Sequence, residues 1–141
     1  MDSTAEETTY TRKFILKQIS ETEEQQKLVQ WLKLKKIFYF AVPNGSVLKG
    51  NALQRAKQMA RLKSEGLVPG TSDIIVMLQE KILFIELKRA KKVLKSGKLS
   101  TSNSIISEAQ KDFIEKVNKF HYTDAKVCYG FNDAMEFING N

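Results

Sequence analysis

Residues 70–88 read GTSDIIVMLQEKILFIELK, and this stretch decides the fold. Two apolar runs rich in β-branched residues, 74–78 and 82–87, flank three polar residues. This pattern is typical of two antiparallel strands joined by a short turn. We therefore expect a β-hairpin inside the sheet of an α/β protein.

Three charged residues stand at the ends of the two runs. Asp73 opens the first run, and Glu86 and Lys88 close the second. Depending on the length of the turn, residue 73 pairs with position 86 or 87, so Asp73 lies beside Glu86 in both cases. Side chains alternate along a strand, so Glu86 and Lys88 share one face, while the carbonyl of Leu87 stays near the acids. The hairpin thus gathers two carboxylates, a carbonyl and an ammonium group.

This set of groups suits metal-dependent chemistry on phosphate. Two carboxylates and a carbonyl fit a hard cation such as Mg²⁺ or Mn²⁺, which borrows its remaining ligands from water and phosphate. The cation would act as a Lewis acid, and Lys88 would hold the attacking water. A Glu-x-Lys pair is also common on solvated strand edges, and an aspartate after Pro-Gly can be a turn residue. However, Glu86 lies within an apolar run, where an unpaired acid is costly to bury.

Four segments resemble the VRR-NUC family: PNG at 43–45, RLKSEGLVPGTSD at 61–73, IELKRAK at 85–91 and ISEAQKDFI at 106–114. That family belongs to the PD-(D/E)xK, or restriction-endonuclease-like, nucleases and includes small stand-alone phage proteins. The resemblance runs from about Glu21 to Ile138. It implies one restriction-endonuclease-like α/β domain, with a mixed sheet flanked by helices.

The resemblance also implies roles for residues of the hairpin. Asp73, Glu86 and Lys88 match the catalytic core of the family. Asp73 and Glu86, with the carbonyl of Leu87, would hold the metal.

Two further residues match the family from outside the hairpin. Gln110 matches the glutamine that borders the site, although it also fits a helix capping box begun by Ser107. A further catalytic and metal-binding acid comes from the first helix, where Glu24 is the best match and Glu21 the alternative. Each could equally be a first-turn acid that complements the helix dipole.

Charge favours a polyanionic partner. The chain of 141 residues has 23 basic and 16 acidic residues, a net charge of +7 and a pI near 9.5, and an excess of that sign favours nucleic acid. The basic residues cluster after the hairpin and on a predicted helix, although such runs are often only solvated faces. The predicted DNA contacts are Arg89, Lys91, Lys92, Lys95, Lys98, Arg55, Lys57 and Arg61.

Several other classes of protein are excluded. The single cysteine, Cys128, lies in an apolar strand and supports neither a disulfide framework nor a zinc site. The stretch SGKLS at 96–100 lacks the first glycine of a phosphate loop, so we expect no nucleotide cofactor. No apolar run is long enough for a signal or a membrane span. We expect a cytoplasmic protein without a membrane partner, in the bacterial host cytoplasm if the gene is phage-encoded.

The expected organisation is a mobile tail over residues 1–19 and one nuclease-like domain over 20–141. A chain of this size makes a single core. Residues 95–104 are rich in lysine, serine and glycine and predict a flexible loop. The predicted helices cover 20–36, 51–65, 107–120 and a segment opened by Asn132, and further strands cover 37–42 and 125–130.

We therefore predict a magnesium- or manganese-dependent, structure-specific endodeoxyribonuclease. The resemblance to stand-alone relatives implies a homodimer that acts on branched DNA and resolves four-way (Holliday) junctions. The alternatives are a flap or nicking repair nuclease that uses the same site, and a catalytically silent DNA-binding module. The presence of Asp73, Glu86 and Lys88 together favours an enzyme.

Overall fold

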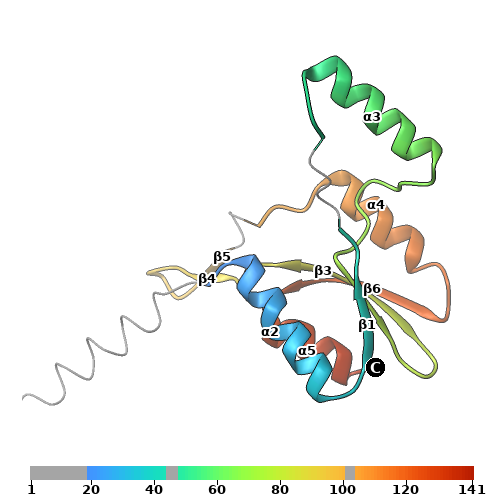
Figure 1. Cartoon of the computed structure of the whole chain (residues 1–141). Helices are drawn as coiled ribbons and strands as arrows, with labels where there is room; N and C mark the ends of the chain where they lie inside the picture. The colour runs from blue at the N-terminus through green and yellow to red at the C-terminus, as the bar shows by residue number, and fades with distance from the viewer. Residues whose placement is uncertain (1–18, 44–47, 101–103) are drawn as a thin grey trace, which may run out of the picture.

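The computed structural model describes residues 19–43, 48–100 and 104–141. Its centre is a four-stranded sheet in the order β1-β2-β3-β6 (Figure 1). β1 and β3 both run antiparallel to β2, and β6 runs parallel to β3. The sheet is therefore mixed, as predicted. Its strands are β1 (Phe38–Ala41), β2 (Ile74–Met77), β3 (Ile82–Lys88) and β6 (Thr123–Tyr129).

Helices cover both faces of this sheet, which confirms the predicted architecture (Figure 1). On one face lie α2 (Glu21–Leu34) and α5 (Phe131–Asn139), and on the other lies α4 (Glu108–Val117). A fourth helix, α3 (Ala52–Ser64), stands apart beyond α4 and contains no buried residue. No helix among the described residues is long and apolar enough to cross a membrane.

The main core lies between the sheet and the pair α2 and α5. Every second residue of β2 and β3 points into it, as alternation along a strand requires. Cys128 is buried there as a free cysteine, as predicted. The core residues are Leu28, Leu32, Ile74, Val76, Leu83, Ile85, Leu87, Cys128, Ala134 and Ile138.

Local capping signals explain where three of the helices begin. Ser20, Asn51 and Ser107 each accept a hydrogen bond from a backbone amide three residues later, and each helix has a complete capping box. Predicted and observed starts therefore agree to within one residue. The predicted start of the last helix at Asn132 was wrong: α5 begins at Phe131 and has no side-chain cap from its N-cap residue.

The segment after β3 also differs from the prediction. Residues 92–100 form a small hairpin of β4 (Lys92–Val93) and β5 (Leu99–Ser100), where a flexible loop was expected from residue 95. Leu94 N–H donates to Lys98 O, and Gly97 N–H donates to Leu94 O, both at 2.8 Å. The sequence did not predict these two-residue strands because the segment is rich in lysine, serine and glycine. Of the predicted tail, only Ile19 lies within the described residues, and most of the predicted turn that begins at Pro43 lies outside them.

Candidate active site

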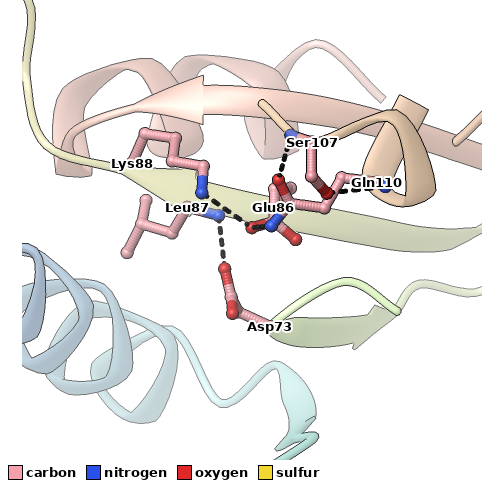
Figure 2. Close-up of polar contacts among 6 residues, drawn as sticks. All are labelled: Asp73, Glu86, Leu87, Lys88, Ser107 and Gln110. Atoms are coloured by element: carbon pink, nitrogen blue, oxygen red, sulfur yellow. Dashed lines mark hydrogen bonds and ion pairs between the residues drawn. The ribbon is translucent and has the colours of Figure 1, made fainter. Parts of the chain in front are cut away.

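The register of the central hairpin places Asp73 beside Glu86. Ile74 pairs with Ile85, so the preceding residue, Asp73, lies opposite Glu86. This is the register of the shorter of the two predicted turns. Asp73 N–H donates to Ile85 O at 3.0 Å, and Leu87 N–H donates to Asp73 Oδ2 at 2.8 Å (Figure 2). These two hydrogen bonds, one of the backbone and one of the side chain, thus fix the aspartate just before β2.

Glu86 is a buried carboxylate, only 2% exposed. Its Oε1 accepts from Gln110 Nε2 at 2.7 Å and pairs with Lys88 Nζ at 3.3 Å, so both donors meet on one oxygen (Figure 2). Its Oε2 has no donor among the described residues. A buried, ionised oxygen without a partner is costly, and a bound cation would remove that cost.

Asp73 also affects the titration of Glu86. The pKa of Glu86 is raised to about 7, first by burial and then by the neighbouring charge of Asp73 and a hydrogen bond to Asp73 that the protonated acid makes. The ammonium of Lys88 opposes this shift of the pKa. One lysine thus does not balance two adjacent carboxylates, and the site favours an additional positive charge.

The carbonyl of Leu87 is turned toward the same place. In a strand the N–H and C=O of one residue point the same way, and the N–H of Leu87 points to Asp73. The backbone of Lys88 faces β6, where its carbonyl accepts from Gly130 N–H at 2.8 Å. The side chain of Leu87 is fully buried in the core on the other face.

These groups fit a magnesium- or manganese-like cation. The described residues contain no cluster of three or more acidic, histidine or cysteine side chains that could hold a metal. The groups that could hold such a cation are therefore two carboxylates, Asp73 and Glu86, and the carbonyl of Leu87. A small hard cation accepts such a partial set because it keeps water and takes ligands from phosphate.

Gln110 serves two structures at once. Its Oε1 accepts from Ser107 N–H at 2.9 Å, which completes the capping box of α4, and its Nε2 donates to Glu86. Close packing of Gly70 brings α4 near: a Cβ at Gly70, whose φ is +79°, would lie 2.3 Å from the carbonyl of Ala109. A glycine is therefore needed there. The sequence did not predict that Gly70 packs against α4, although the Pro69-Gly70 pair indicates a turn at this point.

Glu24 and Glu21 have different surroundings. Glu24 is 6% exposed, and its Oε2 accepts from Phe131 N–H at 2.5 Å. It therefore satisfies the first amide of α5 and complements the dipole of that helix. A role for Glu24 in catalysis remains a prediction. The link to α5 was missed, because nothing in the local sequence pairs residues 107 positions apart.

Glu21 lies on the exposed first turn of α2 and is influenced by the charge of Asp73. Burial raises its pKa; the charges of Lys88 and Arg89 lower the pKa and that of Asp73 raises it. These influences place Glu21 within electrostatic reach of the site. The charges of Asp73 and Lys88 therefore both act on Glu21.

The predicted DNA contacts after β3 have two kinds of setting. Arg89 is half-buried and its Nε donates to Ile19 O at 3.3 Å, which ties β3 to the start of α2. Lys91 is exposed, with Nζ 4.8 Å from the centre of the Tyr129 ring. Exposed cations follow on the β4–β5 hairpin at positions 92, 95 and 98.

The predicted contacts Arg55, Lys57 and Arg61 are all exposed on α3. Arg61 pairs with Glu65 at 3.7 Å, with both side chains more than half exposed, so this pair contributes little to stability. A groove of about 390 Å³ separates the C-terminal half of α3 from the start of α4 and reaches Asp73. Its lining residues are Met59, Lys63, Leu67, Val68, Pro69, Gly70, Thr71, Asp73, Ser107 and Gln110.

Comparison with known proteins agrees with the fold. A solved structure described as a VRR_NUC domain protein matches with a TM-score of 0.63 and 23% sequence identity, covering 89% of this chain and 89% of the other. The predicted likeness to VRR-NUC proteins is thus confirmed at the level of the fold. No family model matches the chain. A search of curated proteins finds no match either.

Proposed function

We propose that this protein is a divalent-metal-dependent nuclease that hydrolyses DNA phosphodiesters. The observation that carries the proposal is the state of Glu86, whose Oε2 is buried without a donor beside a second carboxylate. The fold of a VRR_NUC domain protein and the net charge of +7 support it. A module that only bound DNA would have no need for two adjacent acids where phosphate arrives.

Each group at the site has a part in this chemistry. Asp73, Glu86 and the carbonyl of Leu87 would hold the cation. When bound, the cation supplies positive charge that offsets the charge building on the scissile phosphate. Gln110 holds Glu86 through Oε1 and so leaves Oε2 free for the cation. Lys88, which pairs with Glu86, would hold and orient the attacking water.

The acid from α2 completes this assignment. We assign it to Glu21, because the charges of Asp73 and Lys88 act on Glu21, whereas Glu24 is hydrogen-bonded to the start of α5. At the exposed rim of the site, Glu21 would act on water or on the metal's hydration shell. Glu24 would instead hold α2 and α5 together.

The basic residues would contact the DNA backbone. The cations of the β4–β5 hairpin and of α3 are exposed, as phosphate contacts require. Such contacts position DNA without reading its sequence. The substrate would therefore be selected by its shape, and we propose branched DNA, a four-way junction first, cut by a homodimer with magnesium as the metal.

Cleavage of labelled four-way junction, flap and linear duplex DNA tests these proposals. The assays are run with Mg²⁺, with Mn²⁺ and with a chelator. We expect paired cuts across the junction that require the metal. Cutting of flaps alone would replace the junction by a repair substrate. Tight binding without any metal-dependent cutting would leave a DNA-binding module and refute the enzyme.

Asp73→Asn is the matched inactive variant. An asparagine at this position retains an oxygen that can accept from Leu87 N–H, so the hairpin should stay intact. Only the negative charge is lost. We expect unchanged folding and DNA binding, with cleavage reduced by at least about 100-fold, since loss of one metal ligand removes most of the electrostatic stabilisation of the transition state.

A further inference from the structure

Among the described residues, nothing covers the edge strand β1 on its outer side or on one face. Within that part of the chain it pairs with β2 alone and ends the sheet. Phe38 is 67% exposed and Phe40 is 45% exposed, and Met77 on the adjoining strand is 40% exposed. The two phenylalanine rings lie 6.4 Å apart. An exposed apolar edge strand is a ready site for pairing with another chain.

These residues lie on the same face of the sheet as the acids. Phe40 pairs with Ile75, which pairs with Phe84, and directly paired residues share a face. Alternation then places Glu86 on this face as well. Helix α4 covers the face over β3, where Phe113 packs edge-on against Phe84 at 5.9 Å. The part of this face over β1 keeps its exposed apolar side chains.

We propose that β1 is the homodimer surface and pairs antiparallel with β1 of a second copy of this chain. The strand FYFA carries no charge, so it offers nothing to a phosphate backbone, whereas a second copy supplies both a free edge and matching apolar side chains. Antiparallel pairing of a strand with itself is isologous, as a two-fold dimer requires. The inference rests on the homodimer of the proposed function and locates its surface.

The register of this pairing follows from the backbone. Val42 N–H donates to Asp73 O, so by alternation the backbone groups of Tyr39 and Ala41 point to the free edge. Pairing of Tyr39 with itself across the two-fold axis joins these groups. Phe38 then lies opposite Phe40 of the second copy, and four phenylalanines form one apolar cluster. Both active sites end up on the same face of a continuous eight-stranded sheet.

Oligomeric state in solution tests the surface without DNA or metal, so failure of the dimer is distinguishable from failure of the nuclease. We expect the full chain to sediment as a dimer. Phe40→Glu should give a folded monomer. Ala41→Pro should do the same, because it removes only an outward N–H and proline is tolerated on an edge strand. The matched control is Leu53→Glu on α3, where the leucine is 65% exposed and the dimer should persist.

Cross-linking tests the register and does not depend on the stability of the charged variant. Phe38→Cys mixed with Phe40→Cys should form a disulfide-linked dimer on oxidation, because directly opposite Cα atoms lie about 4.5 to 5.5 Å apart. Each variant alone should cross-link far less. The native Cys128 is buried and serves as the background.

Several results would overturn the proposal. One is a wild type that stays monomeric at high concentration. Another is a dimer that survives both Phe40→Glu and Ala41→Pro. A dimer that is lost only in Leu53→Glu would show that the interface lies on α3. Equal cross-linking in the mixed and single samples would refute the register. If the wild type is a monomer and Phe40→Glu lowers its affinity for DNA, then β1 contacts DNA and not a second copy.

Discussion

Gln110 connects the start of α4 to Glu86, since its Nε2 donates to the Glu86 carboxylate at 2.7 Å while its Oε1 accepts from Ser107 N–H at 2.9 Å. One side chain thereby caps a helix and orients a buried acid. Gln110 can fill both roles, because its side-chain amide has an acceptor, Oε1, and a donor, Nε2. The capping box fixes the side chain, and the fixed side chain fixes which oxygen of Glu86 stays open.

Ser107→Ala and Gln110→Ala separate these two roles. Each breaks the capping box, so each should lower the free energy of unfolding by about 1 kcal/mol. Only Gln110→Ala also releases Glu86, and loss of a residue that orients a metal ligand typically costs about 10- to 100-fold in activity or metal affinity. Thermal melting and cleavage rate measure the two effects. An equal loss of cleavage in Ser107→Ala would show that Gln110 acts through the helix alone.

Glu21→Gln and Glu24→Gln form a second matched pair. Glu24→Gln removes a negative charge from the N-terminus of α5, so we expect a loss of about 1 kcal/mol in stability with cleavage largely kept. Glu21→Gln should keep the melting temperature and lower metal-dependent cleavage, because its charge acts on Asp73 and Lys88. The reverse outcome, a stable but inactive Glu24→Gln protein, would return Glu24 to the catalytic set.

The central hairpin and its acids were predictable from sequence because both follow from local periodicity. Apolar runs give the strands, and alternation puts Glu86 and Lys88 on one face. The turn length alone stayed open, and the structure selects the register that sets Asp73 opposite Glu86. The capping residues are local signals too, so the helix starts at Ser20 and Ser107 were within reach.

The features that sequence did not reveal depend on contacts between distant residues. Asn132 is a good capping residue by type, yet the first amide of α5 is satisfied by Glu24 from another helix. Gly130 adopts a φ of +88° and passes close to Ala90 and Glu24, and no local pattern reports this. The exposure of Phe38 was not predicted either. An apolar run predicts burial, and the position of β1 at the edge of the sheet depends on distant pairing.

Stability should fall with rising pH in the absence of divalent metal. The pKa of Glu86 in the folded protein is raised to about 7 from an ordinary value of 4.5. Its contribution to stability is therefore fully present below pH 4.5 and is lost as the pH rises through 7. Melting temperatures with a chelator, from pH 5 to pH 8, should show this decline beyond that of Glu86→Gln.

Divalent cation should act in the opposite direction on the same group. A cation binds the ionised carboxylates, so its stabilising effect should grow between pH 5 and pH 8. Melting with and without Mg²⁺ at each pH measures this difference. A magnesium effect that is independent of pH, or that persists in Glu86→Gln, would contradict binding at this acid.

Ser72→Ala should stabilise the protein. The hydroxyl of Ser72 is fully buried next to Asp73, and its Oγ has no hydrogen-bond partner among the described residues. An unsatisfied buried hydroxyl costs about 1 to 3 kcal/mol, and alanine removes it while keeping the Cβ. We expect a gain of about 1 kcal/mol, or about 3 °C in melting temperature for a domain of this size. Thr71→Ala is the neighbouring control, because its Oγ1 donates to Val68 O at 2.6 Å and its loss should destabilise. A loss of stability in Ser72→Ala would mean that the Ser72 hydroxyl is satisfied in solution, by a bound water beside the metal site.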